Sequence, residues 1–313
     1  GAKMAYSKKD LISTKDLTTE DIYQILNLAK DYKNLNLQNE KKSPLLKGVT
    51  VVNSFFENST RTRTSFEIAA KRLSSDAINF TASNSSTNKG ETLIDTIKNI
   101  ESMQTDIFIM RHSSSGAAQF VASRTPSCVI NAGDGCNEHP TQALLDLFTI
   151  YEKFGSFNNL TVSIIGDIAH SRVARSNIYA MQTLGIKVKL FGPPQMMQYA
   201  KVFGCEICKD MDEAVSGSDA IIMLRIQLER SDDETPFPSI REYCRYFGLS
   251  KTRMQKAKEN VIILHPGPIN RGVELNSDVA DDPRISTILS QVENGVAVRM
   301  AILDIVYKNL KGL

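Results

Sequence analysis

The chain has 313 residues, of which 42% are hydrophobic and 23% are charged, so it is long enough to form two domains with hydrophobic cores. Its formal net charge of +2 gives no general attraction to nucleic acid or to acidic membranes, so we expect neither as a partner. No apolar run approaches the length of a membrane-spanning helix and no signal-peptide pattern is visible, which favours a cytoplasmic protein.

The first half of the chain alternates predicted helices with predicted strands. Apolar periodicity predicts an amphipathic helix at 18–33, strands at 49–56, 76–80, 106–110 and 127–131, and further helices at 65–73, 91–103 and 141–153. Strands that alternate with helices indicate parallel βαβ units, whose ligands bind at the carboxyl ends of the strands. Gly155 and the polar residues after it are predicted to end a first domain, 4–155.

The second half repeats this alternation in a predicted second domain, 156–290. Its strands are predicted at 161–166, 187–191, 220–224 and 261–264, with a helix at 172–184. The charged segment 225–239 contains two prolines and is predicted to be a mobile loop. An apolar stripe that begins at Val292 and ends at Leu310 predicts a terminal helix within 291–313, with the stripe facing inward. The predicted fold is therefore α/β, with two doubly wound domains that each have a central parallel sheet flanked by helices.

The stretch FFENSTRTRTSFE joins a predicted buried strand to a predicted helix. Its polar residues from Ser59 to Arg63 fall at the first helical turn, where unpaired N–H groups and the helix dipole favour an anion. Phosphate suits them, because arginine can donate two parallel hydrogen bonds and each hydroxyl can donate one. The alternative is that Ser59 or Thr60 only caps the helix and that the arginines are solvated.

Other polar residues follow the ends of predicted strands. Arg111 ends the strand at 106–110, where it could equally be a solvated surface arginine. His139 precedes a helix that Pro140 is suited to begin, and Gln142 lies on the same helical face, so both side chains can reach one small group. A single histidine of this kind is more often structural than functional.

Patterns that would indicate other chemistry are incomplete. The string VSIIGDIAHSRVARS resembles the opening of a nucleotide-binding unit but lacks the glycine fingerprint, and no G-x-x-x-x-G-K-[ST] motif occurs. Cys205 and Cys208 have the spacing of half a zinc site, but no second Cys or His pair lies near them in the sequence. The five cysteines are scattered, as is usual for reduced thiols.

Several of these stretches resemble the aspartate and ornithine carbamoyltransferases, notably FFENSTRTRTSFE, Met110-Arg111-His112, NAGDGCNEHPTQALLDLFT and His265-Pro266-Gly267-Pro268. The resemblance implies transfer of the carbamoyl group of carbamoyl phosphate with neither a metal nor a redox cofactor, and a terminal helix that packs on the first domain. It implies catalytic roles for Arg61, Thr62, Arg111 and His139. It implies substrate contacts from Ser59, Thr60, Arg61, Thr62, Arg111, His139 and Gln142 and from the backbone carbonyls of Pro266 and Gly267.

The second substrate distinguishes the branches of the family. Ornithine enzymes carry His-Cys-Leu-Pro where this chain has HPGPINRGVE, and Arg172, Arg225 and Gln227 suit a dicarboxylate. The resemblance therefore implies that L-aspartate accepts the carbamoyl group, giving N-carbamoyl-L-aspartate and phosphate in pyrimidine synthesis. An ornithine-type enzyme and a non-catalytic carbamoyl-phosphate-binding homologue are the alternatives.

The family also implies that the active site is shared within a homotrimer. Ser85 and Lys89 lie on the polar segment after the strand at 76–80, and the matching family residues enter the site of the neighbouring subunit. Composition alone would favour a solvated loop here. Regulatory chains are possible partners, and the sequence does not decide whether they bind.

Overall fold

The computed structural model describes residues 6–81, 92–227 and 239–313. By contact it divides into two compact units, Gly1–Phe148 with Val292–Leu313, and Thr149–Gln291. The division falls inside helix α6 (Pro140–Phe154), whereas the sequence placed a domain boundary at Gly155. The two units are described separately below as the first and the second unit.

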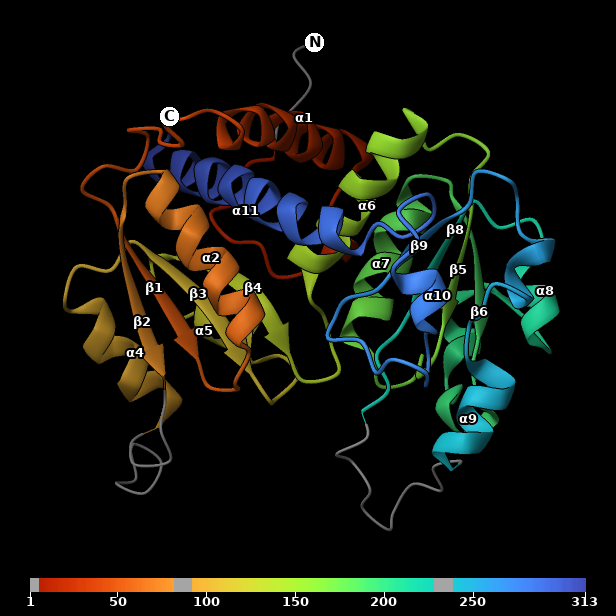
Figure 1. Cartoon of the computed structure of the whole chain (residues 1–313). Coiled ribbons are helices and arrows are strands. Elements are labelled where there is room, and N and C mark those ends of the chain that lie inside the picture. The colour runs from red at the N-terminus through yellow and green to blue at the C-terminus, as the bar shows by residue number, and fades with distance from the viewer. Residues whose placement is uncertain (1–5, 82–91, 228–238) are drawn as a thin grey trace. The chain divides into compact units, whose positions relative to one another are not determined.

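In the described part of the first unit, the strands form a four-stranded parallel sheet in the order β2-β1-β3-β4 (Figure 1). The strands are β1 (Thr50–Phe55), β2 (Asp76–Thr81), β3 (Ile107–His112) and β4 (Cys128–Asp134). The helices are α1 (Thr19–Asn36), α2 (Thr60–Arg72), α4 (Leu93–Glu101), α5 (Ala117–Ala122), α6, and α11 (Ile288–Lys311) from Val292 onward. The short helix α5 was not predicted from the sequence.

Helices cover both faces of this sheet. Val52, Phe108 and Val129 point from three neighbouring strands into a core cluster with α4 and α5. Side chains alternate along a strand, so the preceding residue of β4, Cys128, points to the opposite face, where its thiol donates to the Val306 carbonyl of α11 (3.4 Å). The predicted doubly wound arrangement is confirmed for this unit.

The terminal helix α11 is more deeply buried than its apolar stripe indicated. Every residue from Ala297 to Val306 is buried, whereas Val292, which the stripe placed inward, is 54% exposed. An apolar stripe along one side is typical of a helix that lies on the protein surface, but the middle turns of α11 are buried on all sides. The Tyr32 hydroxyl of α1 donates to Asp304 Oδ2 of α11 (2.6 Å), which joins the two helices lying side by side in Figure 1.

In the described part of the second unit, a five-stranded parallel sheet has the order β7-β6-β5-β8-β9. The strands are β5 (Thr161–Ile165), β6 (Lys187–Phe191), β7 (Glu206–Ile207), β8 (Ala220–Met223) and β9 (Ile262–Leu264). The helices are α7 (Arg172–Thr183), α8 (Met211–Val215), α9 (Ile240–Phe247) and α10 (Ser277–Ala280). Of these elements, β7, α8, α9 and α10 were not predicted, and all are short.

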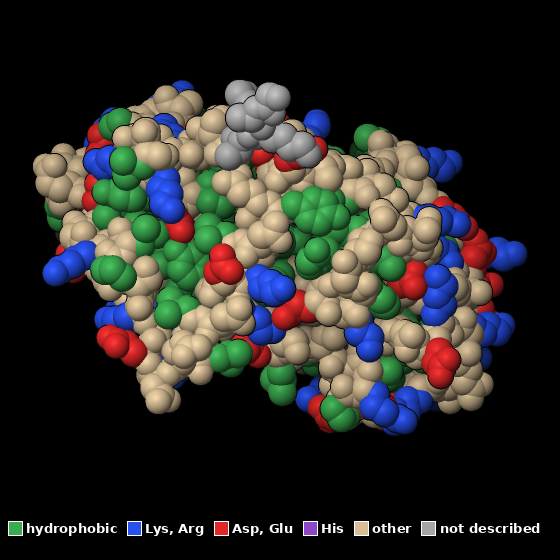
Figure 2. Space-filling view, turned by 90° about the horizontal axis from the view of Figure 1, so that it is seen from above, with side chains coloured by type: hydrophobic (Ala, Val, Ile, Leu, Met, Phe, Trp, Pro, Cys, Tyr) green, Lys and Arg blue, Asp and Glu red, His purple; other side chains and the backbone are tan. Residues whose placement is uncertain are grey.

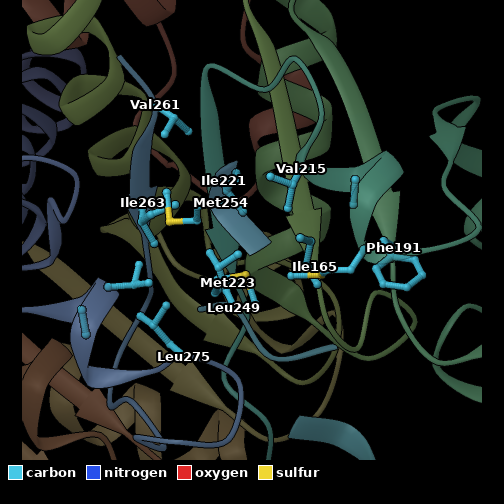
Figure 3. Packing of buried hydrophobic residues seen from close by; sticks show 14 of the residues in the cluster. Ile165, Phe191, Val215, Ile221, Met223, Leu249, Met254, Val261, Ile263 and Leu275 are labelled. Carbon is cyan, nitrogen blue, oxygen red and sulfur yellow. The ribbon is translucent and has the colours of Figure 1, made fainter. Parts of the chain in front are cut away.

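The core of the second unit lies on one face of this sheet. Ile165, Met223 and Ile263 point from three adjacent strands toward Val215 of α8 and Met254 (Figure 3). Helix α7 is absent from this cluster and contacts β6. The second sheet is therefore also parallel and flanked by helices, as the sequence predicts.

The surface carries no concentration of a single charge on the face shown in Figure 2, where Lys and Arg side chains are interspersed with Asp and Glu. This distribution agrees with the small net charge of the chain. Among the helices that the structure describes, none is long and apolar enough to cross a membrane.

The hydrogen bond between Tyr32 and Asp304 makes a testable contribution to stability. Because both side chains are buried, Tyr32→Phe would leave Asp304 without this donor, and we expect the free energy of unfolding to fall by about 2 kcal/mol. Urea denaturation followed by circular dichroism measures the change. Tyr199→Phe is the matched control, since Tyr199 is 82% exposed, and its effect should stay below about 0.5 kcal/mol. Equal effects of the two substitutions would contradict the assignment.

Candidate active site

The predicted strand-to-helix junction is present in the first unit, between β1 and α2. Ser59 is the N-cap of α2, and its hydroxyl accepts a hydrogen bond from the Thr62 backbone N–H (3.4 Å). Thr62 is buried, whereas Thr60 and Arg61 are exposed. The structural alternative is therefore correct in that Ser59 caps the helix. Capping uses the Thr62 N–H, and the exposed Thr60 and Arg61 side chains stand at the positive end of the helix dipole.

Arg111 lies beside this junction and is not a solvated surface arginine. Parallel pairing of β1 with β3 sets Arg111 opposite Phe55, and its side chain is only 12% exposed. Its Nη1 donates to Thr62 Oγ1 (3.4 Å) and to the Ala132 carbonyl (3.2 Å), and its Nε lies 3.6 Å from Glu57 Oε1. A guanidinium is thus held against the first turn of α2, which suits an anion with more than one negative charge.

His112, the residue after Arg111, is a weaker base than a free histidine. Burial lowers the pKa of His112, and the nearby charges of Glu57 and Asp134 only partly oppose this shift. Its Nδ1 accepts a hydrogen bond from the Ser114 backbone N–H (2.9 Å). Arg111 therefore supplies positive charge at the end of β3 without a second cation from its neighbour.

The loop between β4 and α6 is organised by Asp134, which the sequence analysis did not single out. Asp134 is 1% exposed, and its carboxylate accepts hydrogen bonds from the side chains of Asn131 (2.9 Å) and Asn137 (3.0 Å) and from the backbone N–H groups of Glu138 (3.0 Å) and Gly116 (2.8 Å). The position of Asn131 and Asp134 near the carboxyl end of a buried strand was the available signal. This network fixes the backbone that leads into His139.

His139 and Gln142 are both buried, 4% and 8% exposed, at the start of α6. His139 lies immediately before Pro140, and its carbonyl accepts from Ala143 N (3.4 Å). Gln142 donates from Nε2 to Asp146 Oδ1 (3.0 Å), which orients the side-chain amide. The predicted helix start is confirmed, and the roles of the two side chains toward a ligand stay a prediction.

Arg299 of α11 is a buried arginine that the sequence analysis missed. It is 4% exposed, donates to Ser65 Oγ of α2 (2.9 Å) and to Thr141 Oγ1 of α6 (3.3 Å), and stacks over the Phe66 ring at 4.9 Å. Burial, followed by repulsion from Arg111, lowers the pKa of Arg299. This side chain therefore ties together the two helices whose first turns carry the candidate residues of this unit.

In the second unit, candidate residues follow the ends of three adjacent strands. Arg172, half-buried, is the first residue of α7 after β5, and the helix is capped by the Ser171 hydroxyl, which accepts from Ala174 N (3.1 Å). Arg225, half-buried, and Gln227, exposed, follow β8. Because β5, β8 and β9 are neighbours in a parallel sheet, their carboxyl ends lie at the same edge.

Pro266 and Gly267 follow β9 at this edge. Gly267 has a φ of 70°, a conformation that favours glycine, and the Gly267–Pro268 peptide bond is cis. The Asn270 side chain donates to the Ile226 carbonyl (2.6 Å), which connects this turn to the segment containing Arg225 and Gln227. The structure therefore connects the turn that contains Pro266 and Gly267 with the segment that contains Arg225 and Gln227.

Some predicted features fall outside the described residues. Ser85 and Lys89 lie in 82–91, and most of the predicted mobile loop lies in 228–238. Among the residues that the structure describes, no group of three or more His, Cys, Asp or Glu could hold a metal ion. Cys205 and Cys208 are free thiols, and burial raises the pKa of Cys208 to about 11.

Comparison with known protein families covers both units. The family model of the aspartate/ornithine carbamoyltransferase carbamoyl-phosphate-binding domain matches residues 9–152, and that of the Asp/Orn-binding domain matches residues 158–306. The chain belongs to the aspartate/ornithine carbamoyltransferase family. Every candidate residue named above lies within these two matched ranges.

Similar family members include curated proteins and solved structures. The aspartate carbamoyltransferase catalytic subunits of Campylobacter fetus and Campylobacter hominis are 79% and 66% identical over 306 residues, covering 98% of this chain and 99% of each relative. Trypanosoma cruzi aspartate transcarbamoylase, solved with carbamoyl phosphate and aspartate, has a TM-score of 0.83 at 32% identity and covers 96% of both chains. The catalytic subunit of M. Jannaschii aspartate transcarbamoylase has a TM-score of 0.80 at 34% identity, covering 97% of this chain and 100% of that one.

The Asp134 network predicts a large effect of removing one carboxylate. Asp134→Ala would remove the buried acceptor of four hydrogen bonds, so we expect the free energy of unfolding to fall by about 3 kcal/mol. Thermal unfolding monitored by calorimetry measures the loss. Asp16→Ala provides the matched control, because the Asp16 side chain is 59% exposed and 3.9 Å from Lys8. A loss no larger than that of the control would show that the loop does not depend on Asp134.

Proposed function

We propose that this chain transfers the carbamoyl group of carbamoyl phosphate to the amine of L-aspartate, giving N-carbamoyl-L-aspartate and phosphate. The observation that carries this proposal is the 79% identity, over 98% of the chain, to a curated aspartate carbamoyltransferase catalytic subunit. The solved relative from Trypanosoma cruzi holds both of these substrates and has the same fold. The ornithine alternative has no such relative among the similar proteins described above, all of which are aspartate enzymes.

The reaction forms one C–N bond and breaks one C–O bond. The aspartate amine attacks the carbonyl carbon, the oxygen of that carbonyl becomes negatively charged, and its collapse expels phosphate while the nitrogen loses a proton. Positioning and electrostatic stabilisation of the oxyanion can account for catalysis without a cofactor. The departing phosphate can itself accept the proton.

The first unit's residues suit the phosphate and the carbonyl oxygen. In this proposal Ser59, Thr60, Arg61 and Thr62 hold the phosphate, and Thr62, Arg111 and His139 donate to the developing oxyanion. The support is the 3.4 Å contact between Arg111 and Thr62 at a helix N-terminus, since a guanidinium in this position can meet both a phosphate oxygen and the carbonyl oxygen of carbamoyl phosphate. Gln142 accepts from the carbamoyl nitrogen, because its side-chain amide is already oriented by Asp146.

The second unit's residues suit the acceptor. Arg172, Arg225 and Gln227 bind the two carboxylates of aspartate, since arginine pairs with carboxylate in a bidentate manner and glutamine adds a neutral donor. The backbone carbonyls of Pro266 and Gly267 accept from the carbamoyl nitrogen. A site of this kind would reject ornithine, whose side chain carries a positive charge.

We further propose a cytoplasmic homotrimer in which Ser85 and Lys89 enter the site of the neighbouring subunit. β2 is an edge strand, and Ile78 on it is 52% exposed while Ile68 on α2 is 36% exposed, which suits a subunit contact beside residues 82–91. The relatives are named catalytic subunits, so regulatory chains are possible partners. The product can close to a six-membered ring through its carbamoyl nitrogen and β-carboxylate, which supports a role in pyrimidine synthesis.

The direct test offers carbamoyl phosphate with aspartate, with ornithine and with no acceptor, and measures the carbamoylated product. We expect product with aspartate alone. Product with ornithine alone would establish the ornithine alternative. No product with either amino acid, while carbamoyl phosphate still binds in calorimetry, would establish the non-catalytic homologue.

The aspartate contacts are tested by Arg225→Ala in the same assay. Loss of a charge-assisted bidentate contact to one substrate should raise KM for aspartate by about 10²-fold and leave carbamoyl phosphate binding nearly unchanged. Arg284→Ala is the control, since Arg284 belongs to the same unit, is 80% exposed and pairs with Asp282. Equal losses for both substrates in Arg225→Ala would show a folding defect and contradict the assignment.

The shared site is tested by mixing two inactive variants. Lys89→Ala damages the site of the neighbouring subunit, whereas Arg61→Ala damages the site of its own chain. In trimers mixed randomly at equal amounts, an intact site needs its body from the first variant and its loop from the second, so about one quarter of sites should regain activity. Activity that stays at the parental level, while mixed trimers are shown to form by mass spectrometry, would contradict sharing of Lys89.

A further inference from the structure

A fully enclosed histidine–carboxylate pair lies at the carboxyl end of β9 in the second unit. His265 Nε2 is 2.8 Å from Glu274 Oε1, and both side chains are 0% exposed. Neither side chain is therefore accessible for direct contact with a substrate. Neither residue was given a role in the sequence analysis beyond its place in the HPGPINRGVE string.

The hydrogen bonds of the ring determine which nitrogen carries the proton. His265 Nδ1 accepts from the backbone N–H of Gly267 (2.8 Å), so Nδ1 is unprotonated. The proton of the neutral ring is then on Nε2, which donates to Glu274 Oε1. In this tautomer the imidazole forms a rigid link between the Glu274 carboxylate and the backbone of the turn at Pro266 and Gly267.

The same carboxylate oxygen holds a second segment. Glu274 Oε1 also accepts from the backbone N–H of Asn270 (2.8 Å), and the Asn270 side chain donates to the Ile226 carbonyl (2.6 Å). Ile226 is buried, 1% exposed, between Arg225 and Gln227. One oxygen atom thus connects the turn after β9 with the segment after β8.

The buried Glu274 carboxylate stabilises the fold less than an apolar side chain of similar size would. Glu274 Oε2 is buried and has no hydrogen-bond partner among the residues that the structure describes. Burying an ionised group with one oxygen unpaired is costly, and an apolar side chain of similar size would fill the same space at lower cost. The two hydrogen bonds that Glu274 Oε1 accepts lead instead to the segments that follow β8 and β9.

We propose that Glu274 is a positioning residue that fixes, through His265 and Asn270, the carbonyls of Pro266 and Gly267 and the side chains of Arg225 and Gln227. The inference rests on the proposed function, in which the first pair binds the carbamoyl nitrogen and the second binds aspartate. Outer residues that orient contact groups commonly matter because a small misplacement of those groups greatly slows a reaction.

Three variants separate the two connections. Glu274→Ala removes both, and we expect kcat/KM for aspartate to fall by about 10²-fold, through a lower kcat and a higher KM. Glu274→Gln keeps an oxygen that can accept both hydrogen bonds, so it should recover most of this loss. Asn270→Ala keeps its backbone N–H and removes only the link to Ile226, so KM for aspartate should rise by about tenfold with kcat within about twofold of wild type.

The histidine tautomer provides a readout that needs no turnover. The chain has four histidines, so the ring nitrogens can be assigned by ¹⁵N NMR of the labelled protein with single His variants as references. We expect His265 to be protonated on Nε2 in the wild type, in Glu274→Gln and in Asn270→Ala, and to lose this fixed tautomer in Glu274→Ala. A fixed Nδ1–H tautomer in the wild type would overturn the inference.

Asp219→Ala is the matched control for a purely structural role. Asp219 is 8% exposed and accepts from Thr161 N (2.8 Å) at the opposite, amino-terminal ends of β5 and β8. It should lower the unfolding midpoint without changing KM, kcat or the His265 tautomer. If Glu274→Ala behaves like this control, or has wild-type constants, the inference is wrong. If Glu274→Ala does not fold, wild-type KM in Asn270→Ala overturns the inference and a raised KM supports it.

Failure of the proposed function would look different. It would appear as a wild-type chain that makes no carbamoyl aspartate, whereas failure of this inference would appear as an active chain whose constants do not depend on Glu274 or Asn270. The wild-type assay therefore decides the first question, and the variants decide the second.

Discussion

Neighbouring strands in both sheets run parallel, so each strand must be joined to the next by a connection that returns along one face of the sheet. All carboxyl ends in a sheet then lie at one edge, and the residues after them become neighbours although they are far apart in the chain. The register of β1 with β3 illustrates this, since it pairs Phe55 with Arg111 and so brings the guanidinium to Thr62. The candidate residues of each unit depend on this arrangement.

Segments that follow strands have no neighbouring strand to accept hydrogen bonds from their backbone N–H groups. In this protein, buried carboxylates accept several of these hydrogen bonds. Asp134 accepts four hydrogen bonds in the loop before α6, and Glu274 accepts two at the turn after β9. A buried carboxylate is costly unless donors surround it, so the loop and the acid determine each other's conformation. Rigid loops of this kind can present His139, or the carbonyls of Pro266 and Gly267, in a fixed orientation.

The enclosed helix α11 adds a constraint on the first unit. Arg299 donates to hydroxyls on α2 and α6, and Asp304 accepts from Tyr32 on α1. These polar contacts within a packed interior allow few alternative positions of the helices, because an unpaired buried charge would cost several kcal/mol, roughly 3–5. The first turns of α2 and α6 are therefore held by a segment that lies at the other end of the chain.

The sequence by itself determined the α/β class, the long strands and helices, the junction between β1 and α2, and the family, because strong periodicity and turn chemistry are local properties. It did not reveal α5, α8, α9 and α10, which are too short to show a helical period. It misjudged Val292, because a stripe cannot tell a surface helix from an enclosed one. Only the tertiary structure decided that Arg111 lies half-buried beside Thr62, that Arg299 joins two helices and that Glu274 holds two segments, since each depends on residues brought together by strand pairing and helix packing rather than by sequence spacing.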